Sequence, residues 1–245
     1  MSSKRRIAVW SGPRNISTAL MRSWENRADT VVCDEPLYAH YLMETGLLHP
    51  GREEVLASQE RDWRKVAQAL TGEIPAGKWY YYQKQMAHHL LPGIGREWLL
   101  KLTNVLLIRD PAEMLISLIK VTPNPTVSDT GFPQLVELYA WLRESTGVDP
   151  VVVDSRDVLC EPERHLRALC QALDVPFDLA MLAWPAGSRP TDGVWAKHWY
   201  GAVERSTAFV PYRPKTEPVP VELHQLLESC RSDYERLYAC RLRSD

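Results

Sequence analysis

Hydrophobic residues gather in short runs that alternate with longer segments whose apolar positions recur every three to four residues. The short runs predict buried β-strands, because a strand of a parallel sheet covered on both faces is apolar along its length. The clearest such run has the sequence NVLLI. The five expected strands are Arg6–Trp10, Thr30–Cys33, Lys78–Gln83, Asn104–Ile108 and Val151–Val153.

The segments between these runs have helical spacing. After the first run, Ile16, Leu20 and Trp24 fall on one face of a helix. Pro111 opens another helix, in the first-turn position that proline favours. We expect further helices over three segments, which are Glu53–Leu70, Glu161–Leu173 and Pro220–Tyr238.

Strands and helices alternate from one end of the sequence to the other. This order predicts an α/β fold, a three-layer, doubly wound and mostly parallel sheet. A length of 245 residues suits one such unit. We therefore expect a single domain over residues 1–245, and we interpret the patternless stretch Thr122–Phe132 as a mobile lid or an insertion.

Composition narrows the classes of partner. The chain has 29 lysines and arginines and 31 acidic residues, which give a net charge of −2. Proteins that bind nucleic acids or membrane surfaces usually carry an excess of basic residues. We therefore expect a small-molecule partner, no nucleic acid and no membrane; a homodimer is left open. The five scattered cysteines lack C-x-x-C spacing, and no apolar run approaches the ~20 residues of a membrane span. These features favour reduced thiols, a cytoplasmic location and no metal site.

Polar residues that are unusual for an α/β core follow the expected strands directly. They are the run Ser11–Thr18, the pair Asp34-Glu35, Lys84, and the pair Arg109-Asp110. In open α/β sheets, ligands bind at the carboxyl ends of the strands. The sequence therefore predicts a binding site where these four groups meet.

The first of these groups is a strand–loop–helix turn. Free backbone N–H groups and the helix dipole make such a turn an anion site. Ser17 and Thr18 add hydroxyl donors, and Arg14 adds a guanidinium. The plainer alternative is that Asn15 or Ser17 merely caps the helix. Capping alone explains neither the arginine nor the doubled hydroxyls, so we favour an anion site.

This turn departs from the Walker A motif, G-x-x-x-x-G-K-[ST]. Counting from Gly12, the motif's second glycine, lysine and hydroxyl residue are replaced by Ser17, Thr18 and Ala19. The substitutions argue against ATP or GTP hydrolysis, and they remove the hydroxyl expected to hold Mg²⁺.

The run Pro13–Ala19 resembles the PKSGTTW loop of sulfotransferases that use 3′-phosphoadenosine-5′-phosphosulfate (PAPS). In that family the loop holds the 5′-phosphosulfate. The resemblance equates Arg14 with the loop lysine and Ser17-Thr18 with the paired threonines. Asn15-Ile16 replaces Ser-Gly, which implies altered loop geometry and leaves Asn15 as a phosphate donor. By this resemblance, six residues bind the cofactor: Pro13, Arg14, Asn15, Ile16, Ser17 and Thr18.

A second motif, Arg109-Asp110-Pro111 followed by Ser117, is similar to the family's R-[ND]-P…S element. The resemblance implies that Arg109 and Ser117 grip the 3′-phosphate. Arg109 leaves the strand end, and Ser117 lies two helical turns further on, where side chains lean back towards the N-terminus. In the plainer alternative Asp110 caps the helix and Arg109 pairs with a surface carboxylate. A third stretch, VVDSRDVLCEP at 152–162, is similar to the family's YEDLxxDP.

Sulfuryl transfer requires a base to take the acceptor's proton, and a carboxylate or an imidazole can serve. The C-D-E sequence ending at Glu35 resembles the C-G-E of tyrosylprotein sulfotransferases, which makes Glu35 the first candidate. His88 and His89 are the alternative, by resemblance to the K-T-H of cytosolic members. Lys84 matches the family lysine that contacts the transferring group.

A late aromatic and basic segment, residues 193–200, loosely resembles the loop that closes over PAPS in the family. It offers Lys197 to the 3′-phosphate; packing of Trp195 and Trp199 is the alternative. We therefore expect in-line transfer of a sulfuryl group from PAPS to a hydroxyl or amine of a small molecule, without a metal. Glu35 would act as base, and Arg14 and Lys84 would stabilise the leaving phosphate. The alternatives are a P-loop small-molecule kinase and a non-catalytic nucleotide-binding protein of the same fold.

Overall fold

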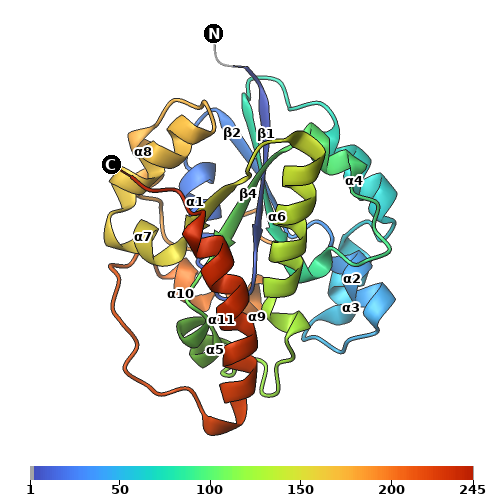
Figure 1. Cartoon of the computed structure of the whole chain (residues 1–245). Coiled ribbons are helices and arrows are strands. Elements are labelled where there is room, and N and C mark those ends of the chain that lie inside the picture. Colours follow the sequence, from blue (N-terminus) through green and yellow to red (C-terminus); the bar gives the residue numbers. More distant parts are fainter. Residues whose placement is uncertain (1–2, 245) are drawn as a thin grey trace.

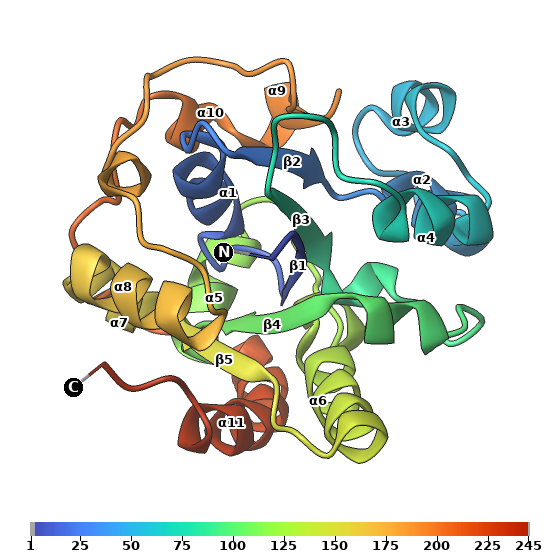
Figure 2. The same ribbon diagram turned by 90° about the horizontal axis from the view of Figure 1, so that it is seen from above.

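The computed structural model describes residues 3–244, which are built around a five-stranded, all-parallel sheet. Figure 1 shows the whole chain, and Figure 2 shows the strand order, β2-β3-β1-β4-β5. The strands are β1 (Arg5–Ser11), β2 (Thr30–Asp34), β3 (Tyr80–Met86), β4 (Thr103–Ile108) and β5 (Val151–Asp154). The α/β prediction is confirmed, and each expected strand is present with its boundaries shifted by a few residues at most.

The buried parts of β1 (residues 7–10) and β4 (residues 105–108) are apolar because helices cover both faces of the sheet. Along β1, Ile7 and Val9 face one hydrophobic cluster, whereas Ala8 and Trp10 face the other. Alternate residues of a strand point to opposite faces, so both sets become buried. All four are at most 1% exposed. Burial on this scale stabilises the sheet by roughly 1.5–3 kcal/mol for each large side chain.

Helices form the outer layers. One face packs against α1 (Ser17–Glu25), α7 (Ser155–Cys160) and α8 (Pro162–Ala172), and the other against α4 (Trp63–Thr71), α6 (Phe132–Thr146) and α11 (His224–Ala239). Figure 2, which looks down on the sheet, shows α1 and α8 on one side and α6 and α11 on the other. The remaining α-helices are α2 (Tyr38–Thr45), α3 (Arg52–Ser58), α5 (Pro111–Leu118), α9 (Ala196–Trp199) and α10 (Gly201–Glu204). No helix within residues 3–244 is both long and apolar enough to span a bilayer.

Two helix predictions need correction, and one long helix was missed. The single helix expected over Glu53–Leu70 is two helices, because Gln59 is extended and ends α3. Asp62 then starts α4, its carboxylate accepting a hydrogen bond from the backbone N–H of Arg64 at 2.9 Å. The last helix begins at His224, after the short 3₁₀ turn Val221–Leu223, and not at Pro220. Helix α6 was not predicted at all.

Part of the stretch interpreted as a lid or insertion is packed into the fold. It contains the 3₁₀ turn Ser128–Thr130 and ends at Gly131, which enters α6 with a φ of 76°. Here it lies against the loop after β1, so closely that a Cβ on Gly12 would fall 2.2 Å from the carbonyl oxygen of Thr130. Glycine is therefore needed at position 12, and the 128–131 turn supports the loop that follows β1.

Candidate active site

A cavity of about 520 Å³ lies at the carboxyl ends of the strands. Every side chain that the sequence predicted for the site lines this cavity, with one exception. The nominated residues that line it are Pro13, Arg14, Asn15, Ile16, Ser17, Thr18, Glu35, Lys84, His88, His89, Arg109 and Ser117. The exception is Lys197, whose ammonium pairs with the exposed Glu54 at 2.6 Å and does not line the cavity.

The loop between β1 and α1 is held in an unusual backbone conformation. Arg14 and Ile16 have φ values of 63° and 59°, in the left-handed region that favours glycine. Helix α1 starts after Ile16, and no side chain caps its first turn. The alternative in which Asn15 or Ser17 merely caps the helix is therefore wrong. The N–H groups of that turn are left available to an anion, and backbone strain of this kind is typical of functional sites.

Asn15 anchors this loop to the sheet. Its side-chain N–H donates to the carbonyl of Leu107, at the end of β4, over 3.2 Å. Its own carbonyl accepts a hydrogen bond of 3.0 Å from the hydroxyl of Ser155. The Asn15 side chain was expected to donate to phosphate, but in the structure its amide is used to hold the loop in place.

Two guanidinium groups and a serine hydroxyl meet beside the loop. Arg14 donates from Nε to the Ser117 hydroxyl at 2.9 Å, and Arg109 donates to the Arg14 carbonyl at 2.9 Å. Burial, together with the charge of Arg109, lowers the pKa of Arg14. Two cations this close repel each other unless an anion lies between them, so the arrangement favours binding of an anion.

The plainer interpretation of the second motif is also present in the structure. Asp110 caps α5, accepting hydrogen bonds from two backbone N–H groups at 2.9 and 3.1 Å. Arg109 pairs with Glu113, its Nη2 lying 3.0 Å from the carboxylate. Neither contact removes Arg109 from the cavity wall, because its Nη1 still reaches the loop after β1. Asp110 thus fixes the start of α5, and Glu113 in that helix holds the guanidinium of Arg109.

A second cluster is built on Lys84, which is 1% exposed. Asp34 lies opposite Lys84 in the parallel register of β2 and β3. The Lys84 ammonium donates to Asp34 at 2.8 Å, to Glu35 at 2.5 Å and to the hydroxyl of Tyr200 at 2.7 Å. An ammonium has three donors, and all three have partners here. Lys84 was expected to contact the transferring group, but in this structure its ammonium holds the two carboxylates.

Burial and charge act in opposite directions within this cluster. Burial raises the pKa of Glu35 above its usual value, and the nearby Lys84 only partly opposes the shift. Burial would lower the pKa of Lys84, but Asp34 and Glu35 outweigh it and hold that pKa well above its usual value. The backbone of Glu35 is strained as well, with a φ of 42°. The cluster therefore presents a carboxylate of increased basicity beside a permanent cation.

The two candidate histidines form part of an aromatic wall. They lie in the 3₁₀ turn Ala87–His89, and the His89 ring stacks on Tyr38 and Tyr41 at centroid distances of 4.8 and 4.6 Å. Burial lowers the pKa of His88 to about 4 and that of His89 well below its usual value. Both imidazoles are therefore neutral at physiological pH. Within residues 3–244, no group of three or more His, Cys, Asp or Glu side chains is placed to hold a metal ion.

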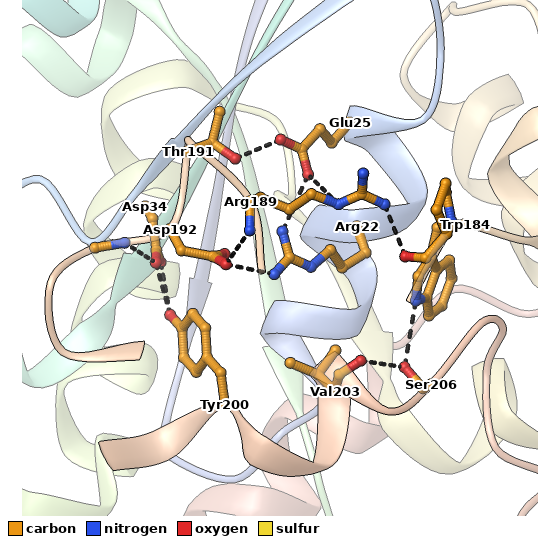
Figure 3. A network of polar contacts seen from close by, with 12 residues as sticks. Arg22, Glu25, Asp34, Trp184, Arg189, Thr191, Asp192, Tyr200, Val203 and Ser206 are labelled. Carbon is orange, nitrogen blue, oxygen red and sulfur yellow. Dashed lines mark hydrogen bonds and ion pairs between the residues drawn. The ribbon is translucent and has the colours of Figure 1, made fainter. Parts of the chain in front are cut away.

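Sequence reasoning missed Tyr200. Its hydroxyl donates to the Asp34 carboxylate, with oxygen–oxygen distances of 2.7 and 2.9 Å, and accepts from the indole N–H of Trp195 at 3.3 Å. Figure 3 shows the Tyr200 ring pointing at Asp34 from the start of α10. Trp195 is 1% exposed, so the packing alternative for this tryptophan is confirmed. In the sequence, the only signal for Tyr200 was its place in the aromatic and basic segment.

The chain before Tyr200 is tied to α1 by a buried ion pair (Figure 3). Arg22, 1% exposed, lies 2.7 Å from the carboxylate of Asp192. The Asp192 carboxylate also accepts a hydrogen bond of 2.7 Å from the backbone N–H of Arg189. The backbone N–H of Gly193, the residue after Asp192, donates to Asp34 at 3.2 Å. These contacts fix the segment that carries Tyr200 to the Lys84 cluster.

Comparison with known proteins gives a family and two relatives. A family model described as a sulfotransferase domain matches residues 5–240. Two curated relatives from Arabidopsis thaliana are branched-chain-amino-acid aminotransferase-like proteins 1 and 2, which are 39% and 36% identical over 222 and 231 residues. The matches cover 91% and 94% of this chain but 40% and 41% of the relatives. The chain thus spans about two fifths of their length.

Solved structures support the same fold. The sulfotransferase domain of the Synechococcus PCC 7002 olefin synthase has a TM-score of 0.54 at 18% identity, with 93% of this chain and 94% of that one covered. The sulfotransferase domain of the curacin biosynthetic pathway has a TM-score of 0.56 at 15% identity, with coverage of 99% and 100%. At these identities the similarity establishes the architecture alone.

Proposed function

This chain belongs to the sulfotransferase domain family, and we propose that it transfers a sulfuryl group from PAPS to a hydroxyl or amine of a small acceptor. One observation carries the proposal. The same cavity is lined by anion-binding groups, namely Arg14, Arg109 and Ser117, and by Glu35, a carboxylate whose pKa is raised. A donor with two phosphate positions and an acceptor that must lose a proton need both kinds of group.

The residues present fit PAPS. The uncapped first turn of α1, with Arg14 and the hydroxyls of Ser17 and Thr18, would hold the 5′-phosphosulfate. Arg109 and Ser117 would hold the 3′-phosphate. When bound, PAPS supplies the sulfuryl group and is released as adenosine 3′,5′-bisphosphate.

Glu35 is the group best suited to take the acceptor's proton. A general base works best with a pKa near the operating pH, and burial moves the pKa of Glu35 in that direction. The pKa of His88, about 4, moves away from it. As the acceptor oxygen or nitrogen forms its bond to sulfur, the bond between sulfur and the 5′-phosphate oxygen would break, and the acceptor's proton would pass to Glu35. The negative charge left on the 5′-phosphate lies next to Arg14 and the N–H groups of α1, which are already oriented to stabilise it.

Lys84 would support this chemistry by holding the base in place. Its contacts with Asp34, Glu35 and Tyr200 hold the Glu35 carboxylate in one orientation. A base that is already oriented loses no further freedom when the acceptor arrives.

The experiment is a transfer assay with ³⁵S-labelled PAPS and a panel of phenols, alcohols and amines, without added metal. We expect label in at least one acceptor and almost none with Glu35→Gln. Parallel reactions with γ-³²P ATP and Mg²⁺ test the kinase alternative, and transfer of ³²P in place of ³⁵S would contradict the proposal. Binding of adenosine 3′,5′-bisphosphate with no turnover of any acceptor would favour the non-catalytic alternative.

A further inference from the structure

The wall of the cavity around the histidines differs in charge from the wall around the arginines. Tyr41 packs against His88 and His89, and both Tyr38 and Tyr41 pack against His49. We call these five residues the aromatic wall. All five line the cavity. Asp129 lies close enough to this wall for its negative charge to act on Tyr41, His49 and His88.

Asp129 is fixed in place but has no cationic partner. One carboxylate oxygen accepts hydrogen bonds of 2.8 Å from both the backbone N–H and the hydroxyl of Thr126. Within residues 3–244, no lysine or arginine lies within ion-pair distance of it, although it lines the cavity. An oriented carboxylate with no counter-charge, facing a cavity, attracts a positively charged ligand group.

The charges near the aromatic wall sum to a negative value. Lys84 cancels only one of the two carboxylates, Asp34 and Glu35, and Asp129 adds another. The histidines contribute no positive charge, because burial lowers the pKa of both His88 and His89. An acceptor bearing a carboxylate or phosphate would therefore be repelled here, whereas the faces of aromatic rings and a free carboxylate both favour a cation.

We propose that the acceptor carries an ammonium group, held by Asp129 and the aromatic wall, while its reacting hydroxyl or second amine lies at Glu35. This inference rests on the proposed function and narrows its acceptor to a class, small amino alcohols, aminophenols and diamines. The anionic groups of PAPS bind beside Arg14 and Arg109, and the ammonium group of the acceptor binds at Asp129. The charge of each part of the cavity thus determines which substrate binds there.

The test uses three phenols of similar size and different charge: tyramine, 4-propylphenol and 3-(4-hydroxyphenyl)propanoate. Their affinities are measured by calorimetry on the protein saturated with adenosine 3′,5′-bisphosphate, and 3-amino-1-propanol and 1-butanol are compared in the same way. We expect each ammonium compound to bind about tenfold more tightly than its neutral partner, and the carboxylate compound to bind most weakly. Equal or reversed affinities within the phenols, or no binding of either ammonium compound, would overturn the inference.

Asp129→Asn supplies the matched variant. The amide oxygen can still accept the Thr126 hydrogen bonds, so the turn keeps its shape while the charge is removed. We expect the preference for tyramine over 4-propylphenol to disappear, with unchanged affinity for the bisphosphate. Asp149→Asn, which removes an exposed carboxylate paired with Arg143 outside the cavity, should keep the preference. A preference that survives in Asp129→Asn would show that Asp129 does not select the acceptor.

If the bisphosphate itself does not bind, the proposed function fails. If the bisphosphate binds and the charge preference is missing, only the acceptor class is wrong.

Discussion

The two charged clusters of the cavity are built in opposite ways. Arg14 lies on the loop after β1 and is only partly buried; it meets Arg109, just before α5, and Ser117, in the last turn of that helix. Lys84 is buried on a central strand, and Asp34, Glu35 and Tyr200 satisfy all of its donors. The first cluster leaves positive charge for a ligand to neutralise, whereas the second neutralises most of its own charge. We therefore propose that the first cluster binds the ligand and that the second accepts the proton.

The largest effect should come from removing the base in the buried cluster. Glu35→Gln keeps the side-chain shape and abolishes basicity, so kcat should fall by about 10²–10⁴ while bisphosphate affinity stays normal. Steady-state kinetics and calorimetry measure the two quantities. His88→Ala and His89→Ala should each lower kcat less. Near-full activity of Glu35→Gln, together with a dead histidine variant, would move the base to the aromatic wall.

The buried cluster should also matter for stability. Lys84→Met leaves Asp34 buried beside Glu35 without a cation, and the free energy of unfolding should fall by about 3–5 kcal/mol. Urea denaturation followed by circular dichroism measures the change. Lys120→Met removes an ion pair with Glu217 in which both side chains are 61% exposed, and it should cost less than about 1 kcal/mol. Similar losses in the two variants would mean that burial does not distinguish these lysines.

The exposed cluster should divide into binding and turnover. Arg109→Ala should weaken bisphosphate binding by about 10- to 100-fold, since it removes charge-assisted hydrogen bonds to a group that the reaction leaves unchanged. Arg14→Ala should lower kcat more than affinity, because charge on the 5′ side develops during transfer. If both substitutions changed affinity alone, this division of roles would be wrong.

The smallest effect concerns pH. If Glu35 is the base, its deprotonated form is the active one, so kcat should be lost as pH falls through its pKa, which burial raises above its usual value. Because the Tyr200 hydroxyl lowers the pKa of Glu35, Tyr200→Phe should move the acid limb of the kcat profile to higher pH. Cys240→Ala, on the surface, serves as the control. An acid limb that does not move would mean that Tyr200 has no influence on the base.

Strand positions and strand-end residues could be predicted because they depend on local patterns. The NVLLI run and the R-D-P motif placed β4 and Arg109 correctly. The break between α3 and α4 depends on a single cap at Asp62, which a hydrophobic pattern cannot reveal. Tyr200 meets Lys84 across 116 positions of sequence, through a segment fixed by the Arg22–Asp192 ion pair. Such contacts are created by tertiary packing, and no spacing in the sequence encodes them.

The aromatic and basic segment, residues 193–200, shows what residue type alone cannot predict. Lys197 looked like a phosphate ligand by its neighbours in sequence, but the four residues of α9 turn it outward to Glu54 and bring Trp199 to the cavity. Two residues that are two positions apart in a helix point to nearly opposite sides, so residue type alone could not decide which of them faces the site.

The central claim is that one cavity holds two phosphate positions of a single nucleotide. Calorimetric titration of the purified protein with adenosine 3′,5′-bisphosphate, AMP and ATP, without metal, tests it most directly. The bisphosphate should bind most tightly, and at about 100 times its Kd it should stabilise the fold by roughly 2.7 kcal/mol, seen as a rise in Tm. Arg109→Ala should reduce its affinity towards that of AMP. Equal affinities of AMP and the bisphosphate for the unmodified protein would contradict the claim.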